Sequence, residues 1–570
     1  MTALDYVVLL GTMLGIAAYG MWRTRQRASL SGYLRGDETI KWGTIGLSVM
    51  ATQASAITFL STPGQGYESG VGFVQNYFGL PIALIIVAAV FLPIYRRLNV
   101  YTAYEYLGRR FDSKTRLLGA CLFLLQRGLA AGITIYAPAI IISTVLHWPI
   151  NLTILFSGVL VIVYTVSGGS KAVSLTQRYQ MTVILLGMVA AFVILLMKMP
   201  EWLGFTDMLR VAGSMGKLKA VDFSLDYHKR YTIWSGVLGG VFLSLSYFGT
   251  DQSQVQRYLA GNSLRESRLG LMFNAVMKIP MQFSILLLGA LVFVFYQFEK
   301  PPIFFNQAVW QAQTQGPAGD RLRSLQDQFA AVHQEKEARI RAWLNAEHSG
   351  DATAETSART QMLEAQQQSN ELIAQAKETL KSADPKVSKT DADYVFITFV
   401  LDYLPHGVIG LLIAVIFAAG FSSTASELNA LGSTTAVDIY QHVVRTGATD
   451  AHYVSASRWF TALWGLIAVS SALFANLVEN LIQAVNILGS VFYGVVLGIF
   501  LVAFFLKRIG GTAVFFAALI AQTLVLAGYF TLQIGYLWYN LIGCAACVIL
   551  SVGLQAIIGP KRKTGAPSAA

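Results

Sequence analysis

The segment Gly46-Leu-Ser-Val-Met-Ala-Thr-Gln-Ala-Ser-Ala-Ile-Thr-Phe-Leu-Ser-Thr-Pro-Gly64 is long enough to cross a bilayer, yet small and hydroxyl residues dominate it. It ends in Pro63 and Gly64, two residues that weaken helices. Such a helix can unwind locally and free backbone carbonyls at membrane depth, where they must line a cavity or coordinate an ion. The alternative interpretation is a close-packed helix that uses its small residues as a packing seam.

Apolar runs of similar length recur along most of the chain. Of the 570 residues, 54% are hydrophobic and 13% are charged, and the mean hydropathy of +0.53 is too high for a soluble protein. The runs do not alternate apolar and polar residues, which argues against a membrane barrel. We therefore expect an all-α integral membrane protein of about thirteen spans. Their approximate limits are 4–22, 43–62, 73–95, 117–147, 150–167, 179–199, 232–250, 270–297, 404–424, 457–476, 480–506, 511–531 and 534–557.

The basic residues predict the orientation, because Lys and Arg concentrate in cytoplasmic loops. Counting spans from a cytoplasmic first loop places most of the basic loop residues inside, with the N-terminus outside and the C-terminus in the cytoplasm. The residues are Arg23, Arg25, Arg27, Arg96, Arg97, Arg109, Arg110, Lys114, Arg116, Lys171, Arg178, Arg257, Arg265, Arg268, Lys507, Arg508, Lys561, Arg562 and Lys563. This bias accounts for the net charge of +11, so we expect the lipid bilayer as a partner and no nucleic acid.

One stretch of the chain is polar and rich in Gln, Ala and Glu. Helical segments near 320–346 and 353–383 flank His348-Ser-Gly-Asp351, which is typical of a helical hairpin. One face is expected to be packed, because apolar residues recur there at helical spacing: Leu322, Leu325, Phe329 and Val332. The hairpin is either a solvated appendage, a cap over the solute entry or a partner-docking element.

These segments divide the chain into four parts. We expect eight spans in 1–299, an extracytoplasmic polar helical insertion in 300–392, five further spans in 393–558 and a basic cytoplasmic tail in 559–570.

Several function classes are not supported by any motif. No GxxxxGK[ST] phosphate loop occurs, so an ATP-driven pump is not expected. No HExxH or EF-hand pattern and no nucleophile–base set is visible, so we do not expect an enzyme or a cofactor. An ion gradient remains as the energy source, unless the protein is a channel or facilitator.

The ninth predicted span ends in a cluster of hydroxyl residues. It reads Ala418-Ala-Gly-Phe-Ser-Ser-Thr-Ala-Ser426, so Ser422, Ser423 and Ser426 lie close together on a helix. Hydroxyls and backbone carbonyls suffice as ligands for a hard monovalent cation such as Na⁺. Serines facing an unwound carbonyl pair on another helix would complete a cation site. The alternative is that the serines bond back to their own helix.

Three motifs give the chain its likeness to a known family. Ala418–Tyr440 ends in Asp-Ile-Tyr, Val166-Ser-Gly-Gly-Ser-Lys-Ala-Val173 contains Gly-Gly-x-Lys-Ala-Val, and Gly249-Thr-Asp-Gln-Ser-Gln-Val-Gln-Arg-Tyr258 contains a Gln-x-x-Val-Gln-Arg loop. The three motifs, in their order along the chain and with this spacing, resemble those of the sodium:solute symporter family. The resemblance implies a LeuT-type fold with a 5+5 inverted repeat and Na⁺ as the coupling ion.

Two further motifs narrow the resemblance. Tyr101-Thr-Ala-Tyr-Glu-Tyr-Leu107 and Ile135-Tyr-Ala-Pro138 are similar to the branch that carries iodide, vitamins and monocarboxylates. The resemblance also implies a bacterial host and hence the inner membrane as the location.

The resemblance implies a sodium site formed by two segments. It would use the backbone carbonyls of Ala51, Ala54 and Ala419 and the hydroxyls of Ser422 and Ser423. Some members hold a second sodium ion with an Asp and a further Ser. Here Gln177 stands in place of the Asp and Ala425 in place of the Ser, so we expect one Na⁺ per solute.

The resemblance also implies a solute site between the second, third, fourth, seventh, eighth and eleventh spans. Gln53, Ser55 and Thr58 would supply hydrogen bonds from the broken helix, and Tyr247 and Phe248 would form an aromatic inner gate. Tyr77 occupies a position where sugar carriers have an acidic or amide group, which disfavours a simple sugar. Core packing or lipid contact is the alternative role for these aromatic residues.

Two charges lie deep in apolar runs, where each costs about 2.5–3.5 kcal/mol and must face a cavity or a partner. Arg127 is a candidate fork for a substrate carboxylate. Lys278 matches a Lys of the sugar carriers, and together with Gln483 it keeps sugars and polyols open. The alternative for both charges is a structural pairing with a carbonyl or a buried carboxylate.

These features lead to one functional interpretation with rivals. We expect a secondary active transporter that couples Na⁺ to a small organic solute, preferably a carboxylate, by alternating access. The alternatives are a Na⁺/sugar or polyol symporter, a transporter-like solute sensor and an uncoupled facilitator. The sequence leaves the oligomeric state open.

Overall fold

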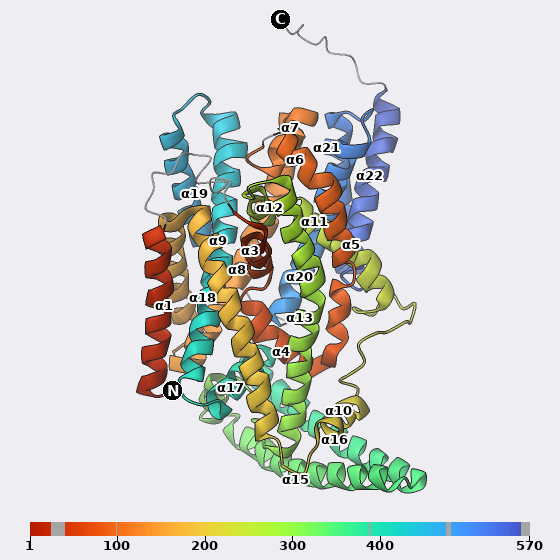
Figure 1. Ribbon diagram of the computed structural model, residues 1–570. Helices are drawn as coiled ribbons and strands as arrows, with labels where there is room; N and C mark the ends of the chain where they lie inside the picture. Colours follow the sequence, from red (N-terminus) through yellow and green to blue (C-terminus); the bar gives the residue numbers. More distant parts are fainter. Residues whose placement is uncertain are drawn as a thin grey trace, which may run out of the picture.

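The computed structural model describes residues 1–23, 40–98, 100–146, 148–385, 387–388, 390–474 and 480–559, and for residues 14, 16–23 and 167–176 only the backbone. Within these residues the regular structure is helical apart from one isolated bridge between Ile40 and Gly261, so the predicted all-α class is confirmed. The helices pack side by side in a bundle (Figure 1). Arg23, Arg25, Arg27, Lys171 and the basic tail, which carried part of the predicted orientation, lie outside the fully described residues.

Most of the predicted spans have a helical counterpart. Eight helical segments are long and apolar enough to cross a bilayer, and the described residues contain three shorter apolar ones. The eight are Ala56–Leu98, Ser113–Leu146, Gln177–Lys198, Leu264–Phe298, Val408–Val444, Leu481–Phe505, Gly511–Thr531 and Trp538–Ile558. The shorter ones are Ala3–Met13, Ile150–Val166 and Ser235–Gly249.

The segment that opens the sequence analysis is a broken helix. Helix α3 (Trp42–Gln53) ends and α4 (Ala56–Ser69) begins around Ala54 and Ser55, which leave helical geometry. Ser55 caps α4, because its hydroxyl accepts from the Ile57 amide. The local unwinding is thus observed. The predicted end of the span at Pro63 and Gly64 is wrong, because α4 continues to Ser69 with Pro63 inside it.

The chain then reverses beside α13 (Leu264–Phe298). The return path consists of η1 (Gly70–Tyr77), α5 (Leu80–Ile86), η2 (Val87–Phe91) and α6 (Leu92–Leu98). Gly70 has φ +75°, and a Cβ there would strike the backbone of Lys217, so the turn requires glycine. Gly66 packs on Leu286 whereas Arg268 donates to the Ala88 carbonyl at 3.0 Å, which shows that α4 and α5–α6 run in opposite directions.

Helix α1 (Ala3–Arg23), which precedes the first broken helix in the chain, lies at the edge of the bundle. After α6 the chain continues through α7 (Ala103–Arg110), α8 (Ser113–Leu146) and α9 (Ile150–Lys198). Helix α9 covers two predicted spans. Its first part packs on α19 (Asp450–Phe474), with Gly158 against Val469 and Ile162 against Gly465. Its second part packs on α18 (Val408–Thr434), with Gln177 on Ser426 and Gly187 on Leu412.

A second broken helix lies opposite the first. It comprises η3 (Ser235–Gly239), α11 (Gly240–Gly249) and α12 (Gln252–Leu259), with the break at Thr250 and Asp251. The Asp251 side chain caps α12 by accepting from the Ser253 amide at 2.9 Å. The sequence interpretation of this motif as a loop is wrong, because the polar residues after the break form a fully buried short helix.

The polar insertion forms the predicted hairpin. Helices α15 (Gly319–Ser349) and α16 (Ala352–Ala383) lie across one end of the bundle, the end at which α1 begins (Figure 1). Gly350, with φ +73°, ends α15, and Asp351 caps α16. The predicted apolar face packs into a small core of its own with Leu372, Ala376 and Leu380. His333 bonds the Tyr296 carbonyl at 3.1 Å and His348 bonds Asp207 at 3.0 Å, so the hairpin is docked on the bundle.

The remaining elements complete the bundle. They are α10 (Phe205–Ser214), α14 (Gln307–Thr314), α17 (Ala392–Tyr403), η4 (Thr435–Val444), α20 (Leu481–Phe505), α21 (Gly511–Thr531) and α22 (Trp538–Ile558). Helix α18 is longer than its predicted span and continues into η4, because the apolar signal fades before the helix ends.

Glycines bring the first broken helix against α13 and α17. A Cβ on Gly289 would overlap the carbonyl oxygen of Pro63, and one on Gly64 would overlap that of Ala392. Without side chains at these points the backbones approach closely, which is how membrane helices gain packing energy. The position of α4 therefore depends on glycine at the contacts.

We predict that Gly289→Ala lowers the stability of the purified protein by about 1–3 kcal/mol, because the added methyl separates α13 from α4. Thermal unfolding in detergent measures this. Gly553→Ala in α22 is the control, since no atom lies within 4 Å of its added Cβ. Equal melting temperatures for the two variants would contradict the close contact.

Candidate functional site

The hydroxyl cluster of α18 lies beside the break in the first broken helix. A Cβ on Gly420 would lie 3.1 Å from the Cβ of Ala56, the first residue of α4. The break leaves the last carbonyls of α3 without most of their intrahelical partners, and the sodium prediction used two carbonyls of this region, those of Ala51 and Ala54. The five predicted ligands are all buried: Ala51, Ala54, Ala419, Ser422 and Ser423.

Both serine hydroxyls bond back to their own helix. Ser422 donates to the Ala419 carbonyl at 3.2 Å and Ser423 to the Gly420 carbonyl at 3.0 Å, which is the alternative that the sequence left open. These bonds use the hydroxyl proton and leave the oxygen lone pairs free to accept or to coordinate. The arrangement therefore offers buried oxygen ligands in two helices that meet at a break.

Gln177 joins the same two helices from α9. Ser48 of α3 donates to its side-chain oxygen at 2.7 Å, and its amide group donates to Ser426 of α18 at 3.2 Å. Gln177 is 0% exposed. A neutral amide with hydrogen-bond partners on both sides therefore bridges α3 and α18.

A cavity of about 80 Å³ lies next to this junction, in the middle of the bundle. Six of the predicted solute contacts line it: Gln53, Ser55, Thr58, Tyr77, Arg127 and Tyr247. Asn76, Thr134, Ser244, Asn486, Glu427 and Tyr493 add further polar groups that the sequence analysis did not select. The space holds roughly five water molecules.

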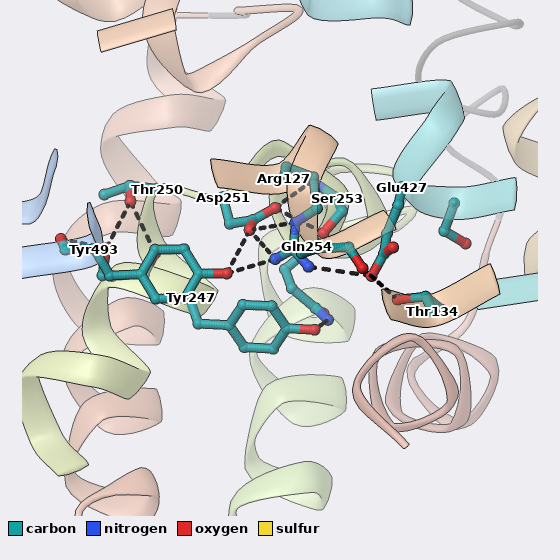
Figure 2. Close-up of polar contacts among 12 residues, drawn as sticks. Arg127, Thr134, Tyr247, Thr250, Asp251, Ser253, Gln254, Glu427 and Tyr493 are labelled. Atoms are coloured by element: carbon teal, nitrogen blue, oxygen red, sulfur yellow. Dashed lines mark hydrogen bonds and ion pairs between the residues drawn. The ribbon is translucent and has the colours of Figure 1, made fainter. Parts of the chain in front are cut away.

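Arg127 of α8 is the centre of a buried charge network on the cavity wall (Figure 2). Its guanidinium pairs with Asp251 at the second break, with an Nε–Oδ2 distance of 3.0 Å, and with Glu427 of α18 at 3.1 Å. Tyr493 of α20 donates to Asp251 at 2.9 Å. The three charged side chains are almost fully buried, and two carboxylates face one cation. The network thus ties four helices together.

Aromatic and amide groups complete the network. The ring of Tyr247 lies 5.4 Å below the Arg127 guanidinium, a cation–π distance, and Gln254 of α12 donates to the Tyr247 hydroxyl at 2.7 Å. Glu427 is also hydrogen-bonded by Thr134 (Figure 2). Each group that touches Arg127 is therefore held by a second partner, which fixes the wall of the cavity.

Three of the predicted solute residues do not line this cavity. Phe248 is fully buried and packs edge-on against Tyr247, with ring centroids 5.0 Å apart. Lys278 lies behind Tyr77, with Nζ 5.1 Å from the ring centroid, and has no hydrogen-bond partner among the described residues. Gln483 accepts from Arg230 and donates to Gln65 of α4, one step toward the hairpin.

Gln483 belongs to a cluster of hydrogen-bonded residues between the central cavity and the hairpin. Gln65 also accepts from Asn480 at 2.5 Å, and the Ile482 amide donates to Ser61 at 3.2 Å, so the start of α20 is fixed to α4. At the opposite end Arg116 pairs with Asp438 at 2.7 Å and joins α8 to η4. Polar contacts between helices therefore lie on both sides of the cavity along the bundle.

The sequence analysis did not identify Asp251, Glu427 or Tyr493 as site residues. A signal was present for the two carboxylates, since a charge inside a membrane protein needs an opposite charge near it and Arg127 had been singled out. The sequence pattern places Asp251 in a loop and Glu427 just beyond the end of a span, where neither requires a partner. Which carboxylates meet Arg127 depends on how α12 and α18 pack.

Comparison with known proteins gives one family. A model described as the sodium:solute symporter family matches residues 33–314 and 376–521, which leaves out most of the hairpin. The sodium/iodide cotransporter of Homo sapiens is 33% identical over 300 residues, 52% of this chain and 46% of that protein. The sodium-coupled monocarboxylate transporter 1 of Homo sapiens is 34% identical over 276 residues, 48% of this chain and 45% of that protein.

A third relative and a solved structure agree with these. The sodium-dependent multivitamin transporter of Oryctolagus cuniculus is 31% identical over 300 residues, 51% of this chain and 46% of that protein. The chain thus spans about half the length of the curated relatives it matches. A Na⁺-coupled sialic acid symporter, solved in a substrate-bound outward-open state, superposes with a TM-score of 0.74 over 98% of this chain and 99% of that one, at 22% identity. The two share a fold.

We predict that Arg127→Gln destabilises the protein by about 3–5 kcal/mol, because it leaves Asp251 and Glu427 buried without a cation. The double variant Arg127→Gln/Asp251→Asn recovers part of the loss, since one of the stranded charges is removed. Chemical or thermal unfolding in detergent measures both.

Arg210→Gln serves as the control, because its pair with Asp207 is partly exposed and is worth at most about 1 kcal/mol. If Arg127→Gln were no more destabilising than Arg210→Gln, the buried network would not be what holds these helices together.

Proposed function

Because the chain belongs to the sodium:solute symporter family, we propose that it couples the inward movement of Na⁺ to the uptake of a small organic solute. The observation that carries the proposal is the pair of buried hydroxyls on α18, Ser422 and Ser423, beside the break in the first broken helix. Free backbone carbonyls and hydroxyl oxygens are the ligands that a hard monovalent cation takes, and broken membrane helices bind coupling ions in this way.

The proposed sodium site contains five oxygens. The carbonyls of Ala51, Ala54 and Ala419 and the hydroxyls of Ser422 and Ser423 would surround the ion, and the ion would thereby tie α3–α4 to α18. One Na⁺ per solute is proposed, because the neutral Gln177 already bridges α3 and α18 by hydrogen bonds and supplies no negative charge.

We favour a small carboxylate as the solute. Lys278 is 0% exposed and has no hydrogen-bond partner among the described residues. Its side-chain nitrogen lies behind the ring of Tyr77, which forms part of the cavity wall. A buried unpaired charge is costly, and an anion that enters when the Tyr77 ring turns would offset that cost. A solute carboxylate could also reach Arg127 by displacing Glu427 from the guanidinium.

A neutral polar solute such as a sugar or polyol is the second candidate. It is favoured by the pairing of Arg127 with two carboxylates, which leaves this wall of the cavity without excess positive charge. Gln53, whose side-chain oxygen has no partner among the described residues, together with Asn76 and Asn486 would then provide the hydrogen bonds.

Alternating access would follow from the two breaks. Each divides a helix at the cavity, so the outer and inner halves can tilt separately, and the polar contacts on both sides of the cavity would break in turn. Sodium would favour the state in which α3–α4 contacts α18, and the coupling is reciprocal: sodium must raise the affinity for the solute as much as the solute raises the affinity for sodium.

The proposed topology is a LeuT-type inverted repeat. Helices α3 to α9 would form one five-span half and η3 to α20 the other, since each half begins with a broken helix. With the N-terminus outside, the hairpin would lie on the outer face of a bacterial inner membrane. The basic loops support this orientation.

We predict that Ser423→Ala raises the Na⁺ concentration for half-maximal uptake by about tenfold, because one ligand of the ion is lost. Na⁺-dependent uptake in proteoliposomes measures this.

Ser433→Ala is a matched control. Ser433 is also buried on α18 and also donates to a carbonyl three residues earlier at 3.0 Å, yet it lies away from the break. A normal sodium activation curve for Ser423→Ala, or the same shift in both variants, would refute the proposed site.

A further inference from the structure

A second and larger cavity lies between the hairpin and the transport bundle. Its volume is about 580 Å³, and its walls come from the ends of α4 and α13, the segment after α10, and both hairpin helices. Figure 1 shows the hairpin crossing the bundle at this end. The cavity exists because the hairpin docks on the helix ends, through contacts such as His333 with the Tyr296 carbonyl, and does not project into solvent.

Two lysines in this cavity lack a carboxylate partner among the described residues. Lys336 of α15 is 3% exposed, and its polar contact is the Ser369 hydroxyl at 3.5 Å, a long hydrogen bond. Lys217 donates to the backbone carbonyl of Glu68 at 2.7 Å and lies 4.3 Å from the ring centroid of Phe293. Neither ammonium is neutralised by these contacts.

The charge balance of the cavity is positive. Lys377 also lines the wall, but it is paired with Asp391 at 2.7 Å. Glu68 is the one acidic residue among the lining residues, against three lysines. Burial lowers the pKa of Lys217 to about 8, and burial together with repulsion by Lys217 lowers the pKa of Lys336 to about 8. Lys217 thus disfavours the charged form of Lys336, whereas Glu68 favours the charged form of Lys217 and Lys336 has no such partner in the part of the chain that the structure describes.

A polar stripe on α4 leads from this cavity to the central one. Thr58 lines the central cavity, Ser61 and Gln65 belong to the hydrogen-bonded cluster between that cavity and the hairpin, and Glu68 lines the hairpin cavity. These residues are spaced by three, four and three positions, so they share one face of the helix. The hairpin cavity therefore lies one helical turn beyond this cluster, on the line along which a solute would reach the central cavity.

The hairpin side of the basic wall lies outside the residues that the family model matches. Lys336 comes from the part of the hairpin that the family model leaves unmatched, between 314 and 376. The aromatic residues and amides beside it, such as Tyr67, Gln367 and Asn370, suit an organic anion with an apolar body and a carboxylate.

We propose that the cavity beneath the hairpin is a binding site for a small organic carboxylate, held by Lys336 and Lys217, where an anionic solute is captured before it enters the central cavity. Only the role of this site on the uptake path depends on the proposed function. Binding itself requires neither sodium nor transport.

The first experiment measures binding to the purified full-length protein in sodium-free choline buffer at pH 7. Pyruvate is the probe, inorganic phosphate and chloride are the competing anions, and glucose is the neutral control. We expect pyruvate to bind and Lys336→Gln to weaken binding at least about tenfold, since a charged hydrogen bond is lost. Arg359→Gln is the control, because it removes the same charge from an exposed position of α16.

Three outcomes overturn the proposal. They are absence of pyruvate binding, equal binding by Lys336→Gln and Arg359→Gln, and tighter binding of phosphate or chloride than of pyruvate, which would mark an inorganic anion site. Should Lys336→Gln fail to fold, Lys217→Gln tests the same contact, because Lys217 lies in the segment after α10 and is only partly buried.

The pH dependence of pyruvate binding is an independent test of whether Lys217 and Lys336 hold the anion. Raising the pH through about 8 removes the protons from Lys217 and Lys336, so we expect the dissociation constant for pyruvate to rise about tenfold between pH 7 and pH 9. Burial lowers the pKa of His333, which is neutral over this range, and Asp391 raises the pKa of Lys377, which stays charged. The other ionisable groups facing the lysines are Glu68, Asp391, Tyr67 and Tyr296. A flat profile would contradict the assignment to these lysines.

Uptake separates this inference from the proposed function. In proteoliposomes that take up pyruvate with sodium, Lys336→Gln should raise KM and leave kcat unchanged, because capture weakens while the central site is intact. If the parent protein shows pyruvate binding in choline but no sodium-driven uptake, the proposed function fails and the anion site stands. If sodium-driven uptake occurs with an unchanged KM in Lys336→Gln, the capture role fails and the proposed function stands.

Discussion

A backbone that leaves its helix inside a bilayer must find partners for the polar groups it frees, and this constraint determines where the site can be. The chain breaks helices at Ala54–Ser55 and at Thr250–Asp251, in each case with a side chain that caps the next helix. The first break is covered by the serines of α18, and the second presents Asp251 to Arg127. The central cavity lies next to the first break, and Arg127, the partner of Asp251, lines its wall.

The charge network around Arg127 has a cost and a use. Burying one cation with two carboxylates stabilises little by itself, since desolvation offsets much of the attraction, but removing Arg127 leaves two carboxylates buried without a cation. The network therefore specifies how α8, α12, α18 and α20 come together more than it adds to the free energy of folding. It also holds a cavity wall whose charge can change when a solute or ion displaces Glu427, a property useful in a protein that must exist in two states.

Much of the fold follows from local signals in the sequence. The spans are visible as apolar runs, the hairpin as helical stretches around Ser349-Gly350-Asp351, and the first break as a span rich in small residues. The second break was missed because Thr250-Asp251-Gln252 carries the same polar signature as a loop, and only its burial under neighbouring helices distinguishes the two. Local sequence patterns describe neighbours along the chain, and this assignment depends on neighbours in space.

The site residues show the same difference between what local sequence predicts and what contacts in space determine. Residues of the broken helix, such as Gln53 and Thr58, reach the cavity because their place is fixed by the break itself. Lys278 and Gln483 lie outside it, behind Tyr77 and against Gln65, in positions that depend on contacts between helices, and their roles in solute binding remain predictions. The basic cavity beneath the hairpin was invisible for the stronger reason that its lysines come from segments more than one hundred residues apart.

The central claim is that a sodium gradient drives the uptake of a small organic solute, and the most direct measurement is solute accumulation in proteoliposomes. The purified protein is supplied with an inward gradient of Na⁺ or, at equal ionic strength, of choline, and a panel of labelled carboxylates, sugars and polyols is followed over time. The account predicts that at least one solute, most favourably a monocarboxylate, accumulates above its outside concentration with Na⁺ and only equilibrates with choline. Equal filling of the vesicles under both gradients for every solute taken up would contradict it.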